Sequence, residues 1–137
     1  MLGALSVFPG PIDRADAQNI LEAEGIANVV TRIDALIDRH LLAETDRDEI
    51  HCHALVRDYC YHVLNRAAKD RFHENAAQYF EAQSNYLAAA HHHFEKGDLA
   101  RALDLLTTNC LAIINAPHDP LPISVSLIVN RGGVVVF

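Results

Sequence analysis

Between residues 29 and 53 the chain changes from a helical to a strand pattern, and this change restricts its fold more than any other feature. Apolar residues first recur with the i, i+3, i+4, i+7 spacing of a buried helical stripe, at Val29, Val30, Ile33, Leu36 and Ile37 of a helix that we expect over Val29–His40. Leu41 and Leu42 then continue as a short strand, Thr45–Asp48 forms a polar turn, and Glu49–His53 returns as a second strand. The sequence therefore predicts a helix that leads directly into a small β-hairpin.

Two further helices are expected before this point. Met1–Val7 is typical of the end of a helix, and the segment Phe8-Pro9-Gly10-Pro11 interrupts it because two prolines and a glycine cannot continue a helix. Asp13 is a good N-cap for a helix over about Arg14–Glu24, and Gly25 stands where a helix commonly ends. The side chains expected to face inward from this helix are Ala17, Ile20 and Leu21.

A long helix is expected after the hairpin, over about Ala54–Ala68. Its apolar residues are assigned to one face: Leu55, Val56, Tyr59, Val63 and Leu64. Three helices, a two-stranded wing and a trailing helix follow the order of a winged-helix domain. We assign this domain to residues 1–69.

Residues 70–116 have the pattern of a helical repeat. Phe72, Ala76, Tyr79 and Phe80 indicate one helix, Asn85–Lys96 a second that ends near Gly97, and Asp98 the cap of a third over Leu99–Ile114. The spacing typical of a tetratricopeptide (TPR)-like unit, with small residues where helices touch and a turn glycine, is found at Tyr86, Ala90, Gly97, Ala102 and Leu106. Such a unit normally stacks on neighbouring repeats.

The last segment, residues 117–137, departs from the helical pattern. An apolar run over 121–129 and the ending Val134–Phe137 flank Gly132 and Gly133, which is typical of two strands around a turn. We expect this irregular or strand-like tail to be an aberrant or truncated end of the chain.

Composition agrees with a mainly α-helical class. Half of the 137 residues are hydrophobic, Ala and Leu dominate them, and tryptophan is absent. The formal charge of −7 repels phosphate backbones at long range and makes DNA an unlikely partner. The three cysteines, Cys52, Cys60 and Cys110, form no C-x-x-C motif, and no signal peptide or membrane span is recognisable, so a cytoplasmic location is expected.

Three blocks of the sequence resemble the winged-helix region of STAND signalling ATPases, the class that includes plant NB-ARC resistance proteins and many bacterial regulators. The blocks are Leu5–Gly10 (LSVFPG), Ile33–Leu42 (IDALIDRHLL) and His53–Tyr59 (HALVRDY). A TPR-like sensor often follows this region in the class, which agrees with the TPR-like spacing of Tyr86–Leu106. The resemblance therefore covers about residues 1–110. It implies that Met1 is an internal or misassigned start and that the partners are an upstream nucleotide-binding domain and downstream helical repeats.

The class carries a Met-His-Asp motif whose histidine is thought to contact the β-phosphate of bound ADP. Only the histidine carries over, as His53, because Cys52 and Ala54 replace its two neighbours. The resemblance implies that His53 senses nucleotide in a full-length protein. Because the chain lacks a Gly-Lys pair, and so a phosphate-binding loop, we expect no enzymatic activity, no cofactor in this chain, and ADP or ATP only in the full-length context.

Other readings of the sequence remain open. A DNA-binding winged helix would place the third helix in the major groove, but between Val29 and Asp48 five acidic residues stand against three arginines. A protein-interaction module would offer the Tyr86–Ile114 hairpin to a protein or peptide.

Metal binding is disfavoured, because the adjacent histidines at 91–93 point about 100° apart on a helix and because His51 and His53 are only two ligands. Arg57 and Asp58 are read as a surface pair or as contacts to a neighbouring domain.

Overall fold

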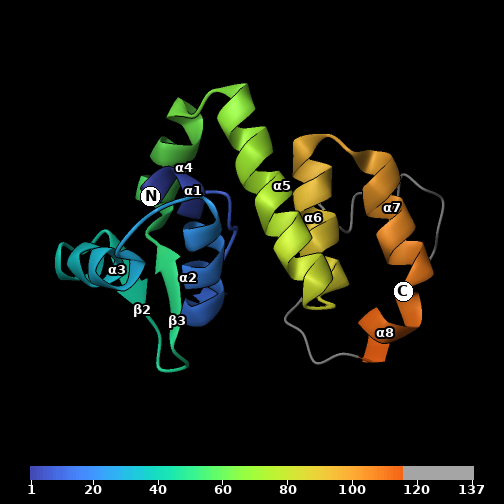
Figure 1. The fold of residues 1–137 in the computed structure, drawn as a ribbon, viewed down its shortest axis with the longest axis horizontal. Helices are drawn as coiled ribbons and strands as arrows, with labels where there is room; N and C mark the ends of the chain where they lie inside the picture. Colours follow the sequence, from blue (N-terminus) through green and yellow to red (C-terminus); the bar gives the residue numbers. More distant parts are fainter. Residues whose placement is uncertain (116–137) are drawn as a thin grey trace. The chain divides into compact units, whose positions relative to one another are not determined.

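The computed structural model describes residues 1–115, and the strand-like tail expected over 117–137 lies outside these residues. The chain divides into two compact units, Met1–Phe72 and His73–Phe137. In the described part the structure is mainly α-helical with one small sheet, as the sequence predicted (Figure 1).

The first unit contains α1 (Leu2–Leu5), β1 (Ile12–Asp13), α2 (Arg14–Ala23), α3 (Val29–Asp38), β2 (Leu42–Glu44), β3 (Glu49–Cys52) and α4 (Ala54–Val63). Its sheet is antiparallel with the order β1-β3-β2, and Ile50 of β3 lies opposite both Ile12 and Glu44. The predicted hairpin is therefore present. The third strand, β1, was not predicted, because two residues after a proline break are too short to show an alternating pattern.

Helix α2 begins and ends where the sequence predicted. The Asp13 side chain accepts hydrogen bonds from the backbone amides of Ala15 and Asp16, which satisfies the helix start. Gly25 has a φ of 82°, and its amide bonds the carbonyl of Glu22 in a glycine-terminated helix end. The predicted inward residues Ala17, Ile20 and Leu21 are buried.

The prediction of one continuous helix over Ala54–Ala68 is wrong, because two helices occupy this region: α4 ends at Val63 and α5 spans Arg66–Ala82. Leu64 is extended with a ψ of 136°, and the Asn65 side chain accepts a 2.8 Å hydrogen bond from the amide of Ala68. Asparagine favours such caps, so it starts a new helix here instead of continuing the old one. The helix expected over Leu99–Ile114 likewise divides at Asn109 into α7 (Leu99–Thr108) and α8 (Cys110–Asn115).

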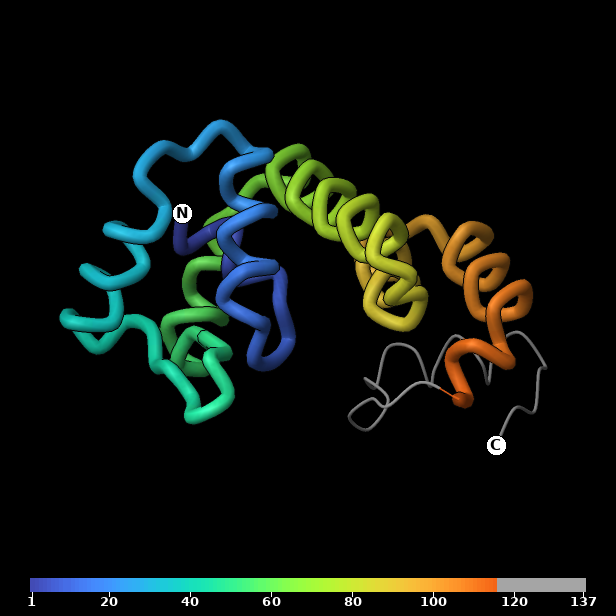
Figure 2. Tube along the Cα trace, turned by 60° about the horizontal axis from the view of Figure 1, so that its bottom comes forward, coloured from blue at the N-terminus to red at the C-terminus, as the bar shows by residue number. Residues whose placement is uncertain are grey.

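The second unit takes up the last part of α5, then α6 (Tyr86–Lys96), α7 and α8. The backbone trace follows the end of α5 into α6 and α7 (Figure 2). Helix α6 packs against α7, and it contacts the end of α5 through His73 and His92. Asn85 and Asp98 cap α6 and α7 through their side chains, and Gly97 ends α6 with a φ of 95°. Small residues fill the interior: Ala76, Ala77, Ala89, Ala90 and Ala102 are fully buried.

Candidate functional site

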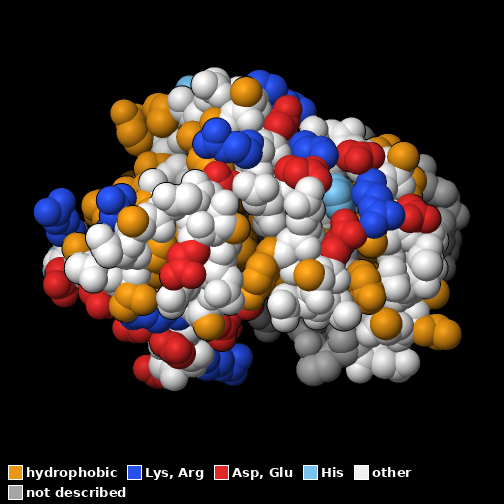
Figure 3. All heavy atoms as spheres, in the orientation of Figure 1, with side chains coloured by type: hydrophobic (Ala, Val, Ile, Leu, Met, Phe, Trp, Pro, Cys, Tyr) orange, Lys and Arg blue, Asp and Glu red, His pale blue; other side chains and the backbone are white. Residues whose placement is uncertain are grey.

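The outer face of α4 carries an apolar stripe that this unit leaves exposed. Leu55 is 86% exposed, Tyr59 69% and Val63 59%. These residues are four apart and so share one side of the helix. Figure 3 shows hydrophobic side chains gathered over the part of the unit where α4 lies. We call Leu55, Tyr59 and Val63 the α4 stripe.

The stripe corrects the expectation that all the apolar residues of this helix share one face. The sequence placed Leu55, Tyr59 and Val63 with Val56 and Leu64, but α4 has two apolar sides. Val56 and Leu64 are partly buried, and Leu64 lies against Gly3 of α1, while the stripe faces away. The i, i+4, i+8 spacing of the stripe was visible in the sequence, although its exposure was not.

His53 stands at the junction of β3 and α4, at the N-terminal end of the stripe. It is the N-cap residue of α4, it is exposed, and its side chain makes no capping hydrogen bond. Its ring meets that of His51 edge to face, with centroids 6.3 Å apart. The first turn of α4 carries no acidic side chain, so nothing offsets the partial positive charge of the helix start. An imidazole in this place is suited to donate to an anion.

Arg57, one turn after His53, serves the fold of the unit. Its Nη1 donates to the carbonyl oxygen of Pro9 at 2.6 Å, and its Nη2 lies 3.1 Å from Oδ1 of Asp58. The pairing with Asp58 was one of two interpretations of the sequence, and a contact to a neighbouring domain was the other. The bond to Pro9 was not foreseen, and it joins α4 to the Pro-Gly-Pro segment.

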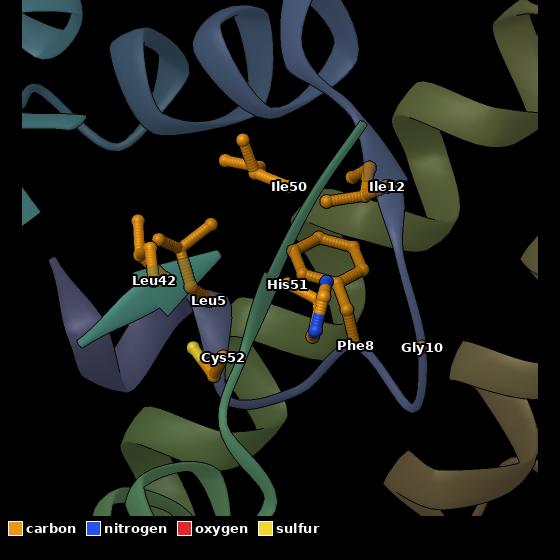
Figure 4. Close-up of a pocket in the computed structure, with 8 residues that line it drawn as sticks. All are labelled: Leu5, Phe8, Gly10, Ile12, Leu42, Ile50, His51 and Cys52. Atoms are coloured by element: carbon orange, nitrogen blue, oxygen red, sulfur yellow. The ribbon is translucent and has the colours of Figure 1, made fainter. Parts of the chain in front are cut away.

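A small cavity lies between the N-terminal segment and the sheet (Figure 4). Its lining residues are Leu5, Phe8, Gly10, Ile12, Leu42, Ile50, His51 and Cys52. The volume open to the centre of a water molecule is about 10 Å³, room for one water and far too little for a nucleotide.

Nδ1 of His51 is buried without a hydrogen-bond partner, and burial raises the pKa of the Cys52 thiol to about 11. Cys52 is therefore a neutral thiol at neutral pH, unsuited to act as a nucleophile.

The surface of α3 and the hairpin is where a winged helix would read DNA, and here it is acidic. Arg14 of α2 is paired with Asp34 of α3 and, at 2.9 Å, with Glu44 of β2, and the hydrogen bond to Asp34 is the main cause that raises its pKa. The exposed acids of α3, β2 and the turn are Asp34, Asp38, Glu44, Asp46 and Asp48, against the exposed arginines Arg32, Arg39 and Arg47. A phosphate backbone would meet net negative charge on this face.

The histidines considered as metal ligands lie in two different units. His51 and His53 are in the first, and His91, His92 and His93 are all buried in α6 of the second. Among residues 1–115, no group of three or more His, Cys, Asp or Glu side chains has an arrangement that could hold a metal ion.

Comparison with known families identifies a winged helix-turn-helix domain over residues 1–65. This match covers α1 to α4 and the three-stranded sheet. No curated protein and no solved structure matches the chain significantly. Within residues 1–115, none of the helices combines the length and the apolar character that a membrane span requires.

Proposed function

We propose that this chain is a regulatory segment that acts by docking on another protein domain, and that the docking face is the α4 stripe with His53 at its edge. The partner we assign is a nucleotide-binding domain loaded with ADP, as in the STAND class that the sequence resembles. The chain would relay the nucleotide state of that domain to helical repeats.

The single observation that carries this proposal is the exposure of the α4 stripe directly after His53. Three large apolar side chains more than half exposed along about 12 Å of helix are costly in water and typical of a surface that a partner covers. An aromatic residue at the centre, Tyr59, is the kind of side chain that concentrates binding energy.

The chemistry at the end of the stripe selects the kind of partner. His53 and the start of α4 together offer a side-chain N–H and a positive helix terminus, which suit a phosphate group. A partner surface that combines an apolar patch with a bound nucleotide phosphate would meet both features at once. The cavity behind β3 cannot take that phosphate, because it holds about one water.

Hydrolysis would have to come from the partner. The six glycines of the chain stand at 3, 10, 25, 97, 132 and 133, and none is followed by lysine, so the sequence offers no phosphate-binding loop. We propose that the chain is not an enzyme by itself.

The experiment begins with the coding DNA upstream, which should encode a phosphate-binding loop that ends in Gly-Lys-Ser or Gly-Lys-Thr. Calorimetry then measures binding of the 137-residue chain to that domain with ADP bound. The double variant Leu55→Gln with Tyr59→Ser should bind at least about tenfold more weakly, the loss of a central anchor. Val30→Gln, an exposed apolar residue of α3, is the matched control and should bind like wild type. Absence of the loop, or equal losses in both variants, would refute the proposal.

DNA binding is the second candidate, favoured by the winged helix-turn-helix match. The acidic face of α3 and the hairpin argues against it. The test is fluorescence anisotropy of a labelled random duplex with the 137-residue chain. The dissociation constant near physiological salt should exceed about 100 μM, which is weaker than ordinary non-specific binding to DNA. Tight binding that weakens steeply with salt, and that Arg32→Ala reduces, would favour the DNA candidate instead.

A further inference from the structure

The second unit buries four histidines where α5 packs on α6. His73 is 1% exposed, His91 7%, His92 2% and His93 4%. Histidine is usually only partly buried, because its ring carries polar atoms and titrates near neutral pH. We call these four residues the histidine cluster.

Two of the rings meet directly. Nδ1 of His73 lies 3.0 Å from Nδ1 of His92, so one nitrogen must donate a proton and the other must accept it. If both rings were protonated, both nitrogens would be donors and the contact would be lost. The Phe80 ring stacks on His92 with an interplanar angle of 3° and centroids 5.8 Å apart, and His91 meets His92 edge to face. These rings leave little room for water to solvate a charge.

Two carboxylates of α5 lie near the cluster, and one of them, Glu81, pairs with a member of the cluster, His93. Oε1 of Glu81 lies 2.6 Å from Nε2 of His93, its Oε2 accepts from Arg101 of α7 at 2.8 Å, and Glu74 pairs with Lys96. Burial alone would raise the pKa of Glu81, but the bonds to His93 and Arg101 lower it below its ordinary value, and the Lys96 hydrogen bond lowers that of Glu74. Both remain ionised under mild acid, so their ion pairs persist there.

Two further acidic residues lie on α6 and α7. On α7, Asp104 pairs with Arg101 at 3.1 Å, and on α6 burial raises the pKa of Glu95. Helix α8 carries no charged side chain. Three neighbouring histidines, His91, His73 and His93, act electrostatically on His92, and each disfavours its protonation.

The surroundings of His91 and His92 therefore oppose the protonation of these two residues in the folded unit. Burial lowers the pKa of His91 to about 4, and burial with the neighbouring histidines lowers that of His92 well below its ordinary value. In the unfolded chain a histidine titrates near 6.5. Above that pH both states are neutral and stability is unaffected. As pH falls below about 6.5 the unfolded state gains protons that the folded state refuses, so stability is lost.

We propose that the histidine cluster is an acid-sensitive latch, which holds α5, α6 and α7 together at neutral pH and releases them on mild acidification while the winged-helix unit stays folded. Each buried histidine shifts the opening equilibrium by up to about tenfold per pH unit between the two pKa values. Two such residues give up to about a hundredfold per unit. The latch would couple the state of the helical unit to pH independently of any nucleotide.

The test is residue-resolved amide hydrogen exchange on the 137-residue chain from pH 8 to 5, corrected for the intrinsic pH dependence of exchange. The amides of α6 and α7 should lose protection below about pH 6.5. Those of α2, α3 and β3 should keep theirs. Unchanged protection at pH 5 in α6, or simultaneous loss in both units, would overturn the proposal.

A variant separates the cluster from general acid effects. His92→Gln keeps a polar side chain that cannot titrate and should move the loss of protection in α6 to lower pH. His62→Gln, at an exposed histidine of α4, is the control and should leave the transition in place. Equal transitions in wild type and His92→Gln would contradict the latch. If His92→Gln fails to fold at pH 8, the wild-type ring signals decide: a folded-state His92 resonance that titrates near 6.5 would refute the proposal, and one that does not would support it.

Discussion

Arg57 and Pro9, 48 residues apart, are joined by a 2.6 Å hydrogen bond from the guanidinium Nη1 to the backbone carbonyl. The bond anchors α4, whose outer face is the α4 stripe, to the Pro-Gly-Pro segment that precedes β1. It fixes the helix that carries His53 without using any residue of the stripe.

Removing this bond should weaken the winged-helix unit. Arg57→Met keeps much of the aliphatic stem and loses the donor, so the free energy of unfolding should fall by about 1–2 kcal/mol. This lies at the low end for a hydrogen bond that involves a charged group, because the Arg57 side chain is 32% exposed. Urea unfolding measures it. The control Arg47→Met, at an exposed residue of the hairpin turn, should change stability by less than about 0.5 kcal/mol. Equal effects of the two variants would show that the bond to Pro9 contributes nothing.

The α4 stripe should be dispensable for folding. Leu55 is 86% exposed, so Leu55→Gln should leave the free energy of unfolding within about 0.5 kcal/mol of wild type. Ile33→Ala, at a fully buried residue of α3, should cost about 2–5 kcal/mol. Thermal unfolding of the two variants makes the comparison. A large loss in Leu55→Gln would mean that the stripe belongs to the core of the unit.

His40 ends α3 in a conformation that favours glycine. Its φ is 59°, and its amide bonds the carbonyl of Ile37 at 2.9 Å while that of Leu41 bonds Leu36 at 3.0 Å. His40→Gly should therefore raise the free energy of unfolding by about 0.5 kcal/mol, since relief of the left-handed strain exceeds the extra entropy of the unfolded chain.

The control for His40 is a position within α3 itself. Ala35→Gly, at an exposed position in the regular part of α3, should lower stability by about 1 kcal/mol. Urea unfolding of both variants tests the pair. A loss of stability in His40→Gly would contradict the strain argument.

Much of the fold was predictable because capping residues mark helix ends locally. Asp13 and Gly25 bound α2, and Asn85, Gly97 and Asp98 bound α6 and the start of α7, as the sequence indicated. Each of these signals depends on a few neighbouring residues, so it does not require knowledge of how the rest of the chain folds.

One of the missed features depends on contacts between distant segments, and another depends on a local cap that was overlooked. β1 exists because Ile12 and Asp13 pair with Ile50 and Glu49 of β3, and two residues carry no periodicity. The break at Leu64 and Asn65 also went unseen, because apolar residues continue through it at helical spacing and the cap of α5 was read as helix interior.

The candidate site was also predicted only in part. His53 was found through a resemblance, and the structure places it exposed at the start of α4. The residues of the stripe were expected to share one face with Val56 and Leu64, and their exposure was not foreseen. Hydrophobic spacing shows that residues share a face but not whether that face is covered.

The central claim, that the first unit docks on a nucleotide-loaded domain through the start of α4, is tested most directly by the rate of ADP release from the full-length protein that the locus encodes. His53→Ala should release ADP at least about tenfold faster than wild type, since the loss of one charge-assisted bond to phosphate is worth about 1.5–3 kcal/mol. His62→Ala, at an exposed histidine of the same helix, should release it at the wild-type rate. An unchanged rate in His53→Ala, or the same acceleration in both variants, would contradict the account.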